Sequence, residues 1–251
     1  MRRDEGVFVA EGAKLVAAAF EAGSAVEGVY VAAEALDAPA LAPVLDLAAA
    51  AGVRVHQLAP GVLERVADTV TPQPVLAVVP MPEATLGDLA GAGFAVVCVD
   101  VRDPGNTGAV IRLADAAGAD GVVCCEGTAD PFNPKTVRAS AGSVLHLPVV
   151  VGGDAAETLR VLGDQGMARV AAVVRDGTPY TDLDELAGPI ALVLGNEAAG
   201  LPAAVTGLID AAATIPMGGR AESLNVAMAA AVLCFEVRRR RSNMQPMRGP
   251  R

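Results

Sequence analysis

The chain has 251 residues, of which 53% are hydrophobic and 19% charged, and its formal net charge at pH 7 is −10. The length leaves room for two domains or one large α/β domain, and the apolar content excludes a disordered chain. The negative charge excludes nucleic-acid binding through a surface that is basic as a whole, because phosphate binding normally needs positive charge.

The first 80 residues alternate short β-branched runs with helical runs. The strand-like runs are "GVFVAEG", "VEGVYVAAE", "VRVHQLA" and "PVLAVVP", and they are separated by runs such as "AKLVAAAFEAG" and "APVLDLAAAAG". This alternation predicts a small α/β domain over residues 1–80. Residues 81–93 combine proline, glycine and acidic residues without an apolar period, which predicts a linker.

Residues 94–241 carry continuous apolar runs, typical of strands buried on both faces of a parallel sheet. These runs are "FAVVCVD", "GVVCC", "LHLPVVV", "RVAAVV", "PIALVLG" and "AAATIPM". Helical stretches such as 107–117 and 155–165 separate them, so we expect a parallel α/β domain with its ligand site beyond the strands' carboxyl ends. Residues 242–251 are predicted to form a flexible tail.

Cysteine and histidine usage argues against a metal site. The four cysteines lie in apolar runs without a C-x-x-C pair, and neither histidine belongs to a metal-binding pattern, so we expect buried thiols in a reducing compartment. No apolar segment of signal-peptide length follows the N-terminus, and the uncharged stretch 226–235 is too short to cross a bilayer. We therefore expect a cytoplasmic protein with no metal and no membrane partner.

The first loop of chemical interest is "VDVRDPGNTGAVIRLADAAGA". Asn106 or Thr107 is predicted to cap a helix, and Arg112 follows within it. Asn106 and Arg112 are thus candidates for contact with an anionic substrate. The alternative is an ordinary helix cap followed by a solvated arginine.

The second loop is "VLGNEAAGLP", where Gly195 and Gly200 bracket a backbone that can approach a ligand closely. The loop matches neither the P-loop pattern nor the dinucleotide fingerprint. Glu197, between the two glycines, either orients a polar group or caps the next turn.

The third loop is "IPMGGRAESLNVAMAAAVLCFEVRRRR". Gly218 and Gly219 form a turn, and Ser223 is the predicted N-cap of the helix that follows. Asn225 has low helix propensity, which indicates either a ligand contact or a local capping hydrogen bond. The arginines 238–241 either touch phosphates or form a solvated helix end favoured by the helix dipole.

Taken together, "NTGAVIR", "LGNEAAGL" and "IPMGGRAESLNVAMA" resemble the three motifs of the SpoU (TrmH-like) family of RNA ribose 2′-O-methyltransferases, in the SPOUT superfamily. The segments "NPKTVRASAGSVLHLPV" and "FVAEGAKLVAAAFEAG" are similar to its ribosomal RNA branch. The resemblance implies a SPOUT-type α/β parallel sheet with a C-terminal trefoil knot, preceded by an α/β domain that binds the RNA substrate. It also implies S-adenosylmethionine as cofactor and a homodimer formed through the knot region.

The resemblance also implies roles for individual residues. It assigns Arg112 as the catalytic arginine, supported by Asn106, Glu197, Ser223 and Asn225. Because a guanidinium with a pKa above about 12 is a poor base, we expect Arg112 to align the target phosphate and stabilise the forming alkoxide. The implied cofactor contacts are Leu194, Gly195, Asn196, Gly200, Ile215, Met217, Leu224 and Asn225, and the implied RNA contacts are Lys135 and Arg138.

The expected substrate is 23S ribosomal RNA, because the N-terminal segment is similar to the ribosomal branch. Transfer RNA is the first alternative. A second is a non-catalytic RNA-binding or ribosome assembly factor with the same fold. A nucleotide-binding enzyme is disfavoured by the missing phosphate-loop patterns.

Overall fold

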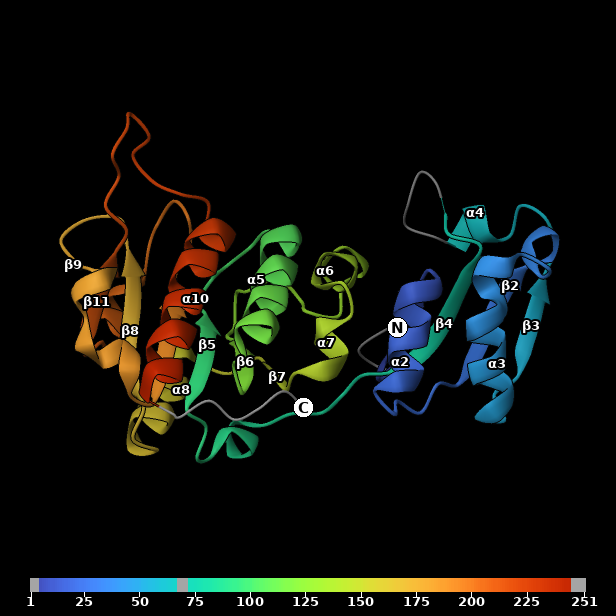
Figure 1. Ribbon diagram of the computed structural model, residues 1–251, viewed down its shortest axis with the longest axis horizontal. Coiled ribbons are helices and arrows are strands. Elements are labelled where there is room, and N and C mark those ends of the chain that lie inside the picture. Colours follow the sequence, from blue (N-terminus) through green and yellow to red (C-terminus); the bar gives the residue numbers. More distant parts are fainter. Residues whose placement is uncertain (1–4, 67–71, 245–251) are drawn as a thin grey trace.

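The computed structural model describes residues 5–66 and 72–244, which form two sheets that share no strand (Figure 1). The first sheet has the order β1-β4-β2-β3. β4 runs antiparallel to its neighbours β1 and β2, whereas β3 is parallel to β2. The strands are β1 (Val7–Glu11), β2 (Gly28–Ala32), β3 (Val55–Leu58) and β4 (Val75–Pro80).

Two helices cover one face of this sheet. Phe8 on β1 and Val29 on β2 pack with Val16 of α2 and Val44 of α3, in one buried cluster. The small α/β arrangement expected for the first 80 residues is therefore present. Its helices are α2 (Ala13–Glu21), α3 (Ala42–Ala50), the short α4 (Leu63–Val66) and the 3-10 turns η1 (Ala33–Ala35) and η2 (Pro39–Leu41).

The second sheet has seven strands in the order β7-β6-β5-β10-β8-β11-β9, and every neighbouring pair is parallel. β5, β6 and β10 are buried along their whole length, as their unbroken apolar runs predict. The strands are β5 (Phe94–Cys98), β6 (Gly121–Cys124), β7 (Val149–Val151), β8 (Ala168–Val173), β9 (Thr178–Pro179), β10 (Ile190–Leu194) and β11 (Ala211–Thr214).

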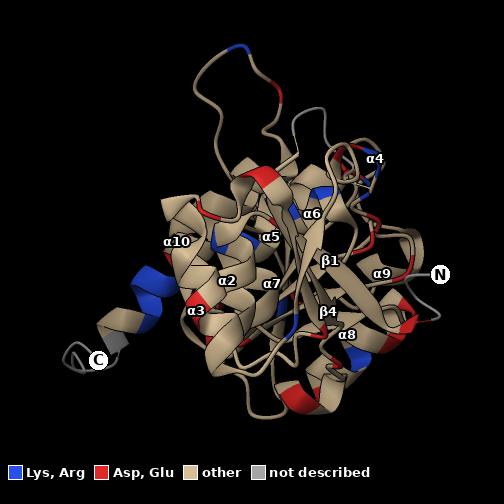
Figure 2. Cartoon of the chain, turned by 90° about the vertical axis from the view of Figure 1, so that its right-hand side faces the viewer, with Lys and Arg blue, Asp and Glu red and all other residues tan. Residues whose placement is uncertain are grey.

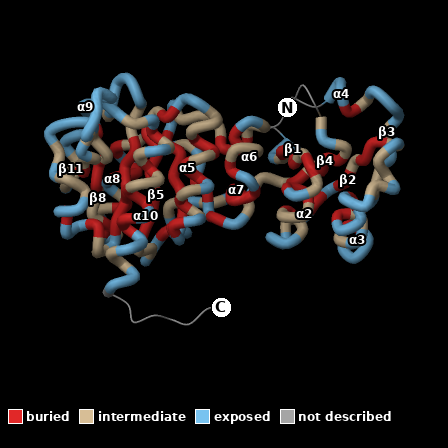
Figure 3. The backbone as a smooth tube through the Cα atoms, turned by 45° about the horizontal axis from the view of Figure 1, so that its top comes forward, coloured by how far each residue is buried: buried red, intermediate tan, exposed pale blue. Residues whose placement is uncertain are grey.

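Helices cover both faces of the second sheet (Figure 3). On one face Ile111 of α5 and Leu233 of α10 pack against β5 and β10, and on the other Leu159 of α8 and Val205 of α9 do so. The helices are α5 (Pro104–Ala117), α6 (Pro134–Ser140), α7 (Ser143–His146), α8 (Ala155–Asp164), α9 (Ala203–Thr206) and α10 (Val226–Met244), with the 3-10 turns η4 (Tyr180–Asp182) and η5 (Asp184–Ala187).

Three local expectations differ from the structure. The predicted linker contains a 3-10 helix, η3 (Leu86–Leu89), which Thr85 and Asp88 close with a reciprocal capping box. The predicted strand "LHLPVVV" is shorter, because its first residues belong to α7. Helix α10 continues to Met244, so the first three residues of the predicted tail are helical, while 245–251 lie outside the described residues.

The two sheets are joined by more than the chain connection. The rings of Phe8 on β1 and Phe132 before α6 have centroids 5.4 Å apart, and both side chains are buried. Next to them, Arg138 of α6 lies 3.6 Å from the carboxylate of Glu11. An apolar contact of this kind restrains the two units relative to each other.

The four cysteines are buried free thiols, as the sequence predicts. Burial raises the pKa of Cys125 to about 11 and that of Cys234 to about 12. His56 stacks on Tyr30, and His146 lies 3.8 Å from Asp115. Across the described ranges, no group of three histidine, cysteine or acidic side chains could hold a metal ion, and no helix could span a bilayer.

The insertion of β10 between β5 and β8 places sequence-distant strands side by side. Helix α10 then packs back against α5 and η5, beside strands formed earlier in the chain. This strand order accommodates a chain crossing near the C-terminus, and the trefoil knot itself stays a prediction.

Candidate functional site

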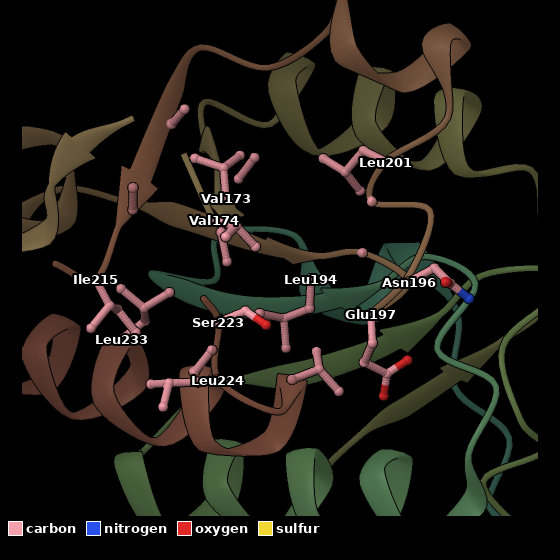
Figure 4. Close-up of a pocket in the computed structure, with 18 of the residues that line it drawn as sticks. Val173, Val174, Leu194, Asn196, Glu197, Leu201, Ile215, Ser223, Leu224 and Leu233 are labelled. Atoms are coloured by element: carbon pink, nitrogen blue, oxygen red, sulfur yellow. The ribbon is translucent and has the colours of Figure 1, made fainter. Parts of the chain in front are cut away.

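The carboxyl ends of β8 and β10, together with β11 and the segment after it, border a cavity of about 530 Å³ (Figure 4). Because these strands are parallel, the loops that follow them meet at one edge of the sheet, where α/β proteins place their ligands. Most of the wall is aliphatic. Its side chains include Val173, Val174, Leu194, Leu201, Ile215, Leu224, Val226 and Leu233.

The cavity contains seven of the eight residues expected to contact a cofactor. They are Leu194, Gly195, Asn196, Gly200, Ile215, Met217 and Leu224. The eighth, Asn225, does not line the cavity and lies in a polar cluster beside it. Ser223, expected to support catalysis, lines the wall instead.

The 194–201 loop is closed by a small backbone bridge. Asn196 and Gly200 exchange both of their backbone N–H to carbonyl bonds, at 3.2 and 2.8 Å. Gly200 has a φ of +68°, which glycine adopts without strain. A Cβ on Gly195 would lie 2.9 Å from the carbonyl carbon of Gly200, so this position requires glycine if the bridge is to form.

The side chain of Asn196 points away from the cavity and stabilises the loop from behind (Figure 4). Its amide oxygen accepts the N–H groups of Ala198 and Ala199, at 2.9 and 3.0 Å. Its Nδ2 donates to the backbone carbonyl of Asp100, at 3.0 Å. Asn196 thus shapes the cavity wall through the backbone, whereas its amide binds the end of β5.

A polar cluster stands at the mouth of the cavity and unites the three loops of chemical interest. Nδ2 of Asn106 donates to Oε1 of Glu197 at 2.5 Å, and Nδ2 of Asn225 donates to Oδ1 of Asn106 at 3.0 Å. These residues lie up to 119 positions apart in the chain. Because Glu197 also lines the cavity, the cluster presents a carboxylate and two amides beside an apolar chamber.

The caps that position this cluster differ from the predicted ones. Asp103, rather than Asn106 or Thr107, caps α5: its carboxylate accepts the N–H of Asn106 at 2.9 Å, and Pro104 takes the first helical position. That bond and the nearby Lys135 lower the pKa of Asp103. Asn106 is therefore free to use its side chain in the cluster.

Asn225, rather than Ser223, occupies the capping position before α10. Its Oδ1 accepts the N–H of Ala227 at 2.9 Å while its Nδ2 donates to Asn106. The two explanations left open for Asn225, a capping bond and a role in the site, are thus compatible, because an amide carries both an acceptor and donors. Ser223 lies two residues earlier, exposed in the loop.

Arg112 is not part of this cluster. It is exposed on α5, and it does not line the cavity. Six residues along a helix correspond to about 9 Å of rise and about 120° of rotation, so Asn106 and Arg112 project from different sides of α5. The single chain therefore assembles the amides and the carboxylate without the arginine.

The two expected RNA contacts both lie beside acidic groups of the same chain. Nζ of Lys135 lies 3.1 Å from the Asp103 carboxylate, and both side chains are about half exposed. Arg138 is more enclosed, with 33% of its side chain exposed, and its partner Glu11 is 8% exposed. Lys135 remains accessible to a phosphate, whereas Arg138 lies at the contact between the two sheets.

The arginines at the end of α10 form the blue segment beyond that label in Figure 2, and three of them bind other groups of the chain. Nη1 of Arg238 donates to the carbonyl of Ala116 at 2.6 Å. Glu236, with only 9% of its side chain exposed, accepts from Arg239 and Arg240, which lowers the pKa of its carboxyl group. These hydrogen bonds were not predicted, and both earlier explanations, phosphate contacts and a solvated helix end, stay predictions because Arg238 and Arg239 are still exposed.

One structural requirement of the first motif was missed. A Cβ on Gly108 would lie 2.4 Å from the carbonyl oxygen of Thr136 and 2.6 Å from the Cβ of Ala139. Gly108 therefore allows α5 to pack closely on α6. The glycine inside a predicted helix was the sequence signal from which this close contact could have been predicted.

Comparisons with known proteins show which family the chain resembles. Residues 93–235 match the model of the SpoU rRNA methylase family, and residues 1–77 match that of an MRM3-like substrate binding domain. The chain is 36% identical over 187 residues to a 23S rRNA (guanosine(2553)-2′-O)-methyltransferase, RlmP, of Bacillus subtilis, covering 74% of this chain and 73% of the relative.

Two solved structures resemble nearly the whole chain. An AdoMet-bound rRNA methyltransferase from Sinorhizobium meliloti superposes with a TM-score of 0.82 at 34% identity, covering 95% of this chain and 89% of that one. The SpoU methyltransferase AviRb from Streptomyces viridochromogenes, in complex with AdoMet, gives a TM-score of 0.84 at 31% identity, covering 96% and 93%.

Proposed function

The chain belongs to the SpoU rRNA methylase family, and from this premise we propose that it methylates a ribose 2′-hydroxyl of 23S ribosomal RNA, using S-adenosylmethionine. The observation that carries the proposal is the polar cluster of Asn106, Glu197 and Asn225 at the mouth of the apolar cavity. It joins one residue from each of the three motif loops at a single point.

The cavity fits the cofactor in size and chemistry. Its volume lies in the range of small-molecule sites, and its aliphatic wall suits an adenine ring and the methylene groups beside the sulfonium. The close approach of Gly195 to Gly200 keeps the loop backbone compact at the wall. Leu194, Ile215 and Leu224 would hold the cofactor, which supplies an electrophilic methyl group when bound.

The polar cluster serves the acceptor side of the reaction. Asn106 is fixed through both ends of its amide, so Glu197 and Asn225 are held in a defined geometry. Such an arrangement can orient a ribose hydroxyl and favour loss of its proton, since it is organised before the substrate binds. Arg112 supplies positive charge for the adjacent phosphate and the developing alkoxide.

For Arg112 to act there, a second copy of the chain has to supply it. Helix α10 carries an outward apolar stripe in which Met228 and Phe235 are 62% and 45% exposed, with half-buried Ala231 and Val232 between them. Because α10 packs beside α5, this stripe and Arg112 lie on neighbouring helices. We propose a homodimer through this C-terminal region in which Arg112 of each copy serves the other's site.

The dimer is tested by replacing Met228 and Phe235 with glutamate. The double variant should sediment as a monomer and lose methylation, because two charges cannot be buried in an apolar interface. Glutamate at the exposed Val151 of β7 is the matched control and should remain dimeric. A dimeric, active double variant would move the interface elsewhere.

Ribosomal RNA is favoured over transfer RNA because the matching family model is that of rRNA methylases and the Bacillus subtilis relative is a 23S rRNA methyltransferase. The polar cluster of Asn106, Glu197 and Asn225 argues against a non-catalytic RNA-binding role, because such a role does not require it. The four buried free thiols fit a reducing compartment, so we place the enzyme in the cytoplasm. The RNA contacts Lys135 and Arg138 remain part of the proposal, with Lys135 the more accessible.

Mapping ribose methylation across total RNA from cells with and without the gene tests the function directly. One 23S rRNA position should lose its methyl group in the deletion strain, and purified protein with S-adenosylmethionine should restore it. A lost methyl group in a transfer RNA would favour the alternative substrate. No change in any RNA, with no cofactor binding by calorimetry, would contradict the enzyme.

A further inference from the structure

In the described part of the chain, most of one face of the first sheet is uncovered, opposite α2 and α3, which lie in front of the sheet in Figure 1. Strand alternation turns Val9, Val78, Tyr30 and His56 toward this face, and Val9 is 41% exposed. Among the described residues, two parts of the face are covered: Leu63 packs on Leu76, with Tyr30 against the same cluster, and Arg138 lies over Glu11. Parallel and mixed sheets normally bury such a surface, so an occupant is expected.

A stack of two rings stands on this face. The rings of Tyr30 on β2 and His56 on β3 lie parallel within 15°, with centroids 4.9 Å apart, and both side chains are half-buried. The tyrosine ring lies over Gly28, where any Cβ would come within 3.4 Å of it. β3 is the edge strand, so no strand flanks His56 on its outer side.

We propose that this stack receives an unpaired base of the RNA substrate, with the base extending the two rings to three. The inference rests on the proposed function for the identity of the ligand. Aromatic side chains on an open sheet are one of the main ways in which proteins bind single-stranded RNA. Arg54, two residues before His56 and exposed, lies on the same face within reach of the adjoining phosphate.

The charge of the chain favours stacking as the binding mode. With a net charge of −10, the protein cannot rely on a broad basic surface to hold RNA. The charged residues of this face are Glu11 on β1, engaged with Arg138, and Arg54, which directly precedes β3. Ring stacking needs no net charge, and it is tolerant of base identity.

Tyrosine fluorescence tests the proposal, because the chain has two tyrosines, Tyr30 and Tyr180, and no tryptophan. In a Tyr180→Phe variant, Tyr30 alone emits, and an eight-nucleotide oligoadenylate should quench at least about half of the signal by stacking. In the matched Tyr30→Phe variant, where Tyr180 alone emits, the same RNA should leave the signal unchanged after absorption correction. Equal quenching in both, or none in either, would overturn the proposal.

Affinity provides the second measurement. His56→Ala should weaken oligoadenylate binding about tenfold, whereas His146→Ala, the other histidine, should not change it. Arg54→Gln should lower the slope of log affinity against log salt by about 1. Undiminished binding of oligoadenylate by the His56 variant would overturn the proposal. The proposal would also be overturned if this face bound a protein while oligoadenylate left the Tyr30 fluorescence unquenched.

The methylation assay separates this inference from the proposed function. If the wild-type protein methylates 23S rRNA but RNA does not quench Tyr30 fluorescence, the proposed base stacking is wrong and the proposed enzymatic function is supported. If RNA quenches Tyr30 fluorescence but no RNA is methylated under any condition, the proposed enzymatic function is wrong and the proposed base stacking is supported.

Discussion

The two sheets differ in which part of the sheet is left open: the larger sheet leaves one edge open, and the smaller sheet leaves one face open. The seven-stranded sheet is covered by helices on both faces, and its chemistry lies at one edge, where the loops after β8, β10 and β11 border the cavity. Within the described residues, helices cover one face of the four-stranded sheet, and its two stacked rings lie on the other, which is mostly open. A buried parallel sheet leaves its strand ends for function, whereas a sheet with one bare face can use the face itself.

The contrast predicts a separation of effects. Changes at the edge of the large sheet should alter turnover or cofactor affinity and leave RNA affinity nearly intact. Changes on the bare face should do the reverse. Any variant that moves both quantities together would break the comparison.

The largest effect is expected at Asn106, the centre of the polar cluster. Asn106→Ala removes the bonds to Glu197 and Asn225, so kcat should fall at least about 100-fold, as when one preorganised donor is lost. Cofactor affinity should hold, because Asn106 does not line the cavity. Single-turnover methylation and calorimetry measure the two quantities, with the exposed Asn243→Ala as control. A normal rate would exclude the cluster from catalysis.

Arg112→Ala should reduce kcat about as strongly, and the origin of that loss can be traced. If the arginine acts across the dimer, mixing Arg112→Ala with Asn106→Ala and exchanging subunits should restore about a quarter of wild-type activity, because half of the dimers carry one intact site of two. Mixtures that stay inactive would place Arg112 in the same chain's site or outside it.

Gly195 is expected to show a smaller effect, confined to the cofactor. In Gly195→Ala the new Cβ would meet the Gly200 backbone at 2.9 Å, so the bridge has to open and affinity for S-adenosylmethionine should fall about tenfold or more. Gly207→Ala is the matched control, since a Cβ there meets open space. Calorimetric binding within twofold of wild type would show that the loop tolerates the opening.

The sequence predicts most strands of both sheets, because their apolar runs are distinctive and each run contains one strand, whereas the two-residue β9 was not predicted. The residues of the cavity wall can be predicted for the same reason, since the glycine-rich loops that directly follow such runs lie at one edge of the parallel sheet. The helix caps were harder. Ser223 and Asn225 are both good capping residues two positions apart, and only the course of the loop selects Asn225.

Side chains that pair across the fold could not be predicted. Lys135 meets Asp103 and Arg138 meets Glu11, partners 32 and 127 positions away in the chain. Arg112 shows a related limit: its motif position suggests proximity to Asn106, but helix geometry turns the two side chains apart. The stack of Tyr30 on His56 depends on the parallel register of β2 and β3, which a pattern of apolar residues does not reveal.

The smallest effect concerns the helix that covers the larger sheet. Glu236 binds Arg239 and Arg240, and Arg240 also donates to the carbonyls of Leu183 and Thr181, which fastens α10 to the segment before β10. Glu236→Gln keeps an acceptor oxygen but loses the charge, so unfolding free energy should fall by about 1 kcal/mol, with turnover unchanged. Asn243→Ala, an exposed position near the end of the same helix, should leave the unfolding free energy unchanged within error.

The pH dependence identifies the charge as the cause. The arginines hold the pKa of the Glu236 carboxyl group below its ordinary 4.5, so the folded state binds this proton less readily than the unfolded state. The stabilisation is complete above the unfolded pKa and is lost as the pH falls through the folded pKa. Urea unfolding of wild type and Glu236→Gln should therefore differ at pH 7 and converge once the pH has fallen below the lowered pKa of the folded state. If the difference in unfolding free energy between wild type and Glu236→Gln persists in acid, the lost stability comes from packing rather than from the ion pairs. Helix α10 would then be held on the larger sheet by apolar contacts alone.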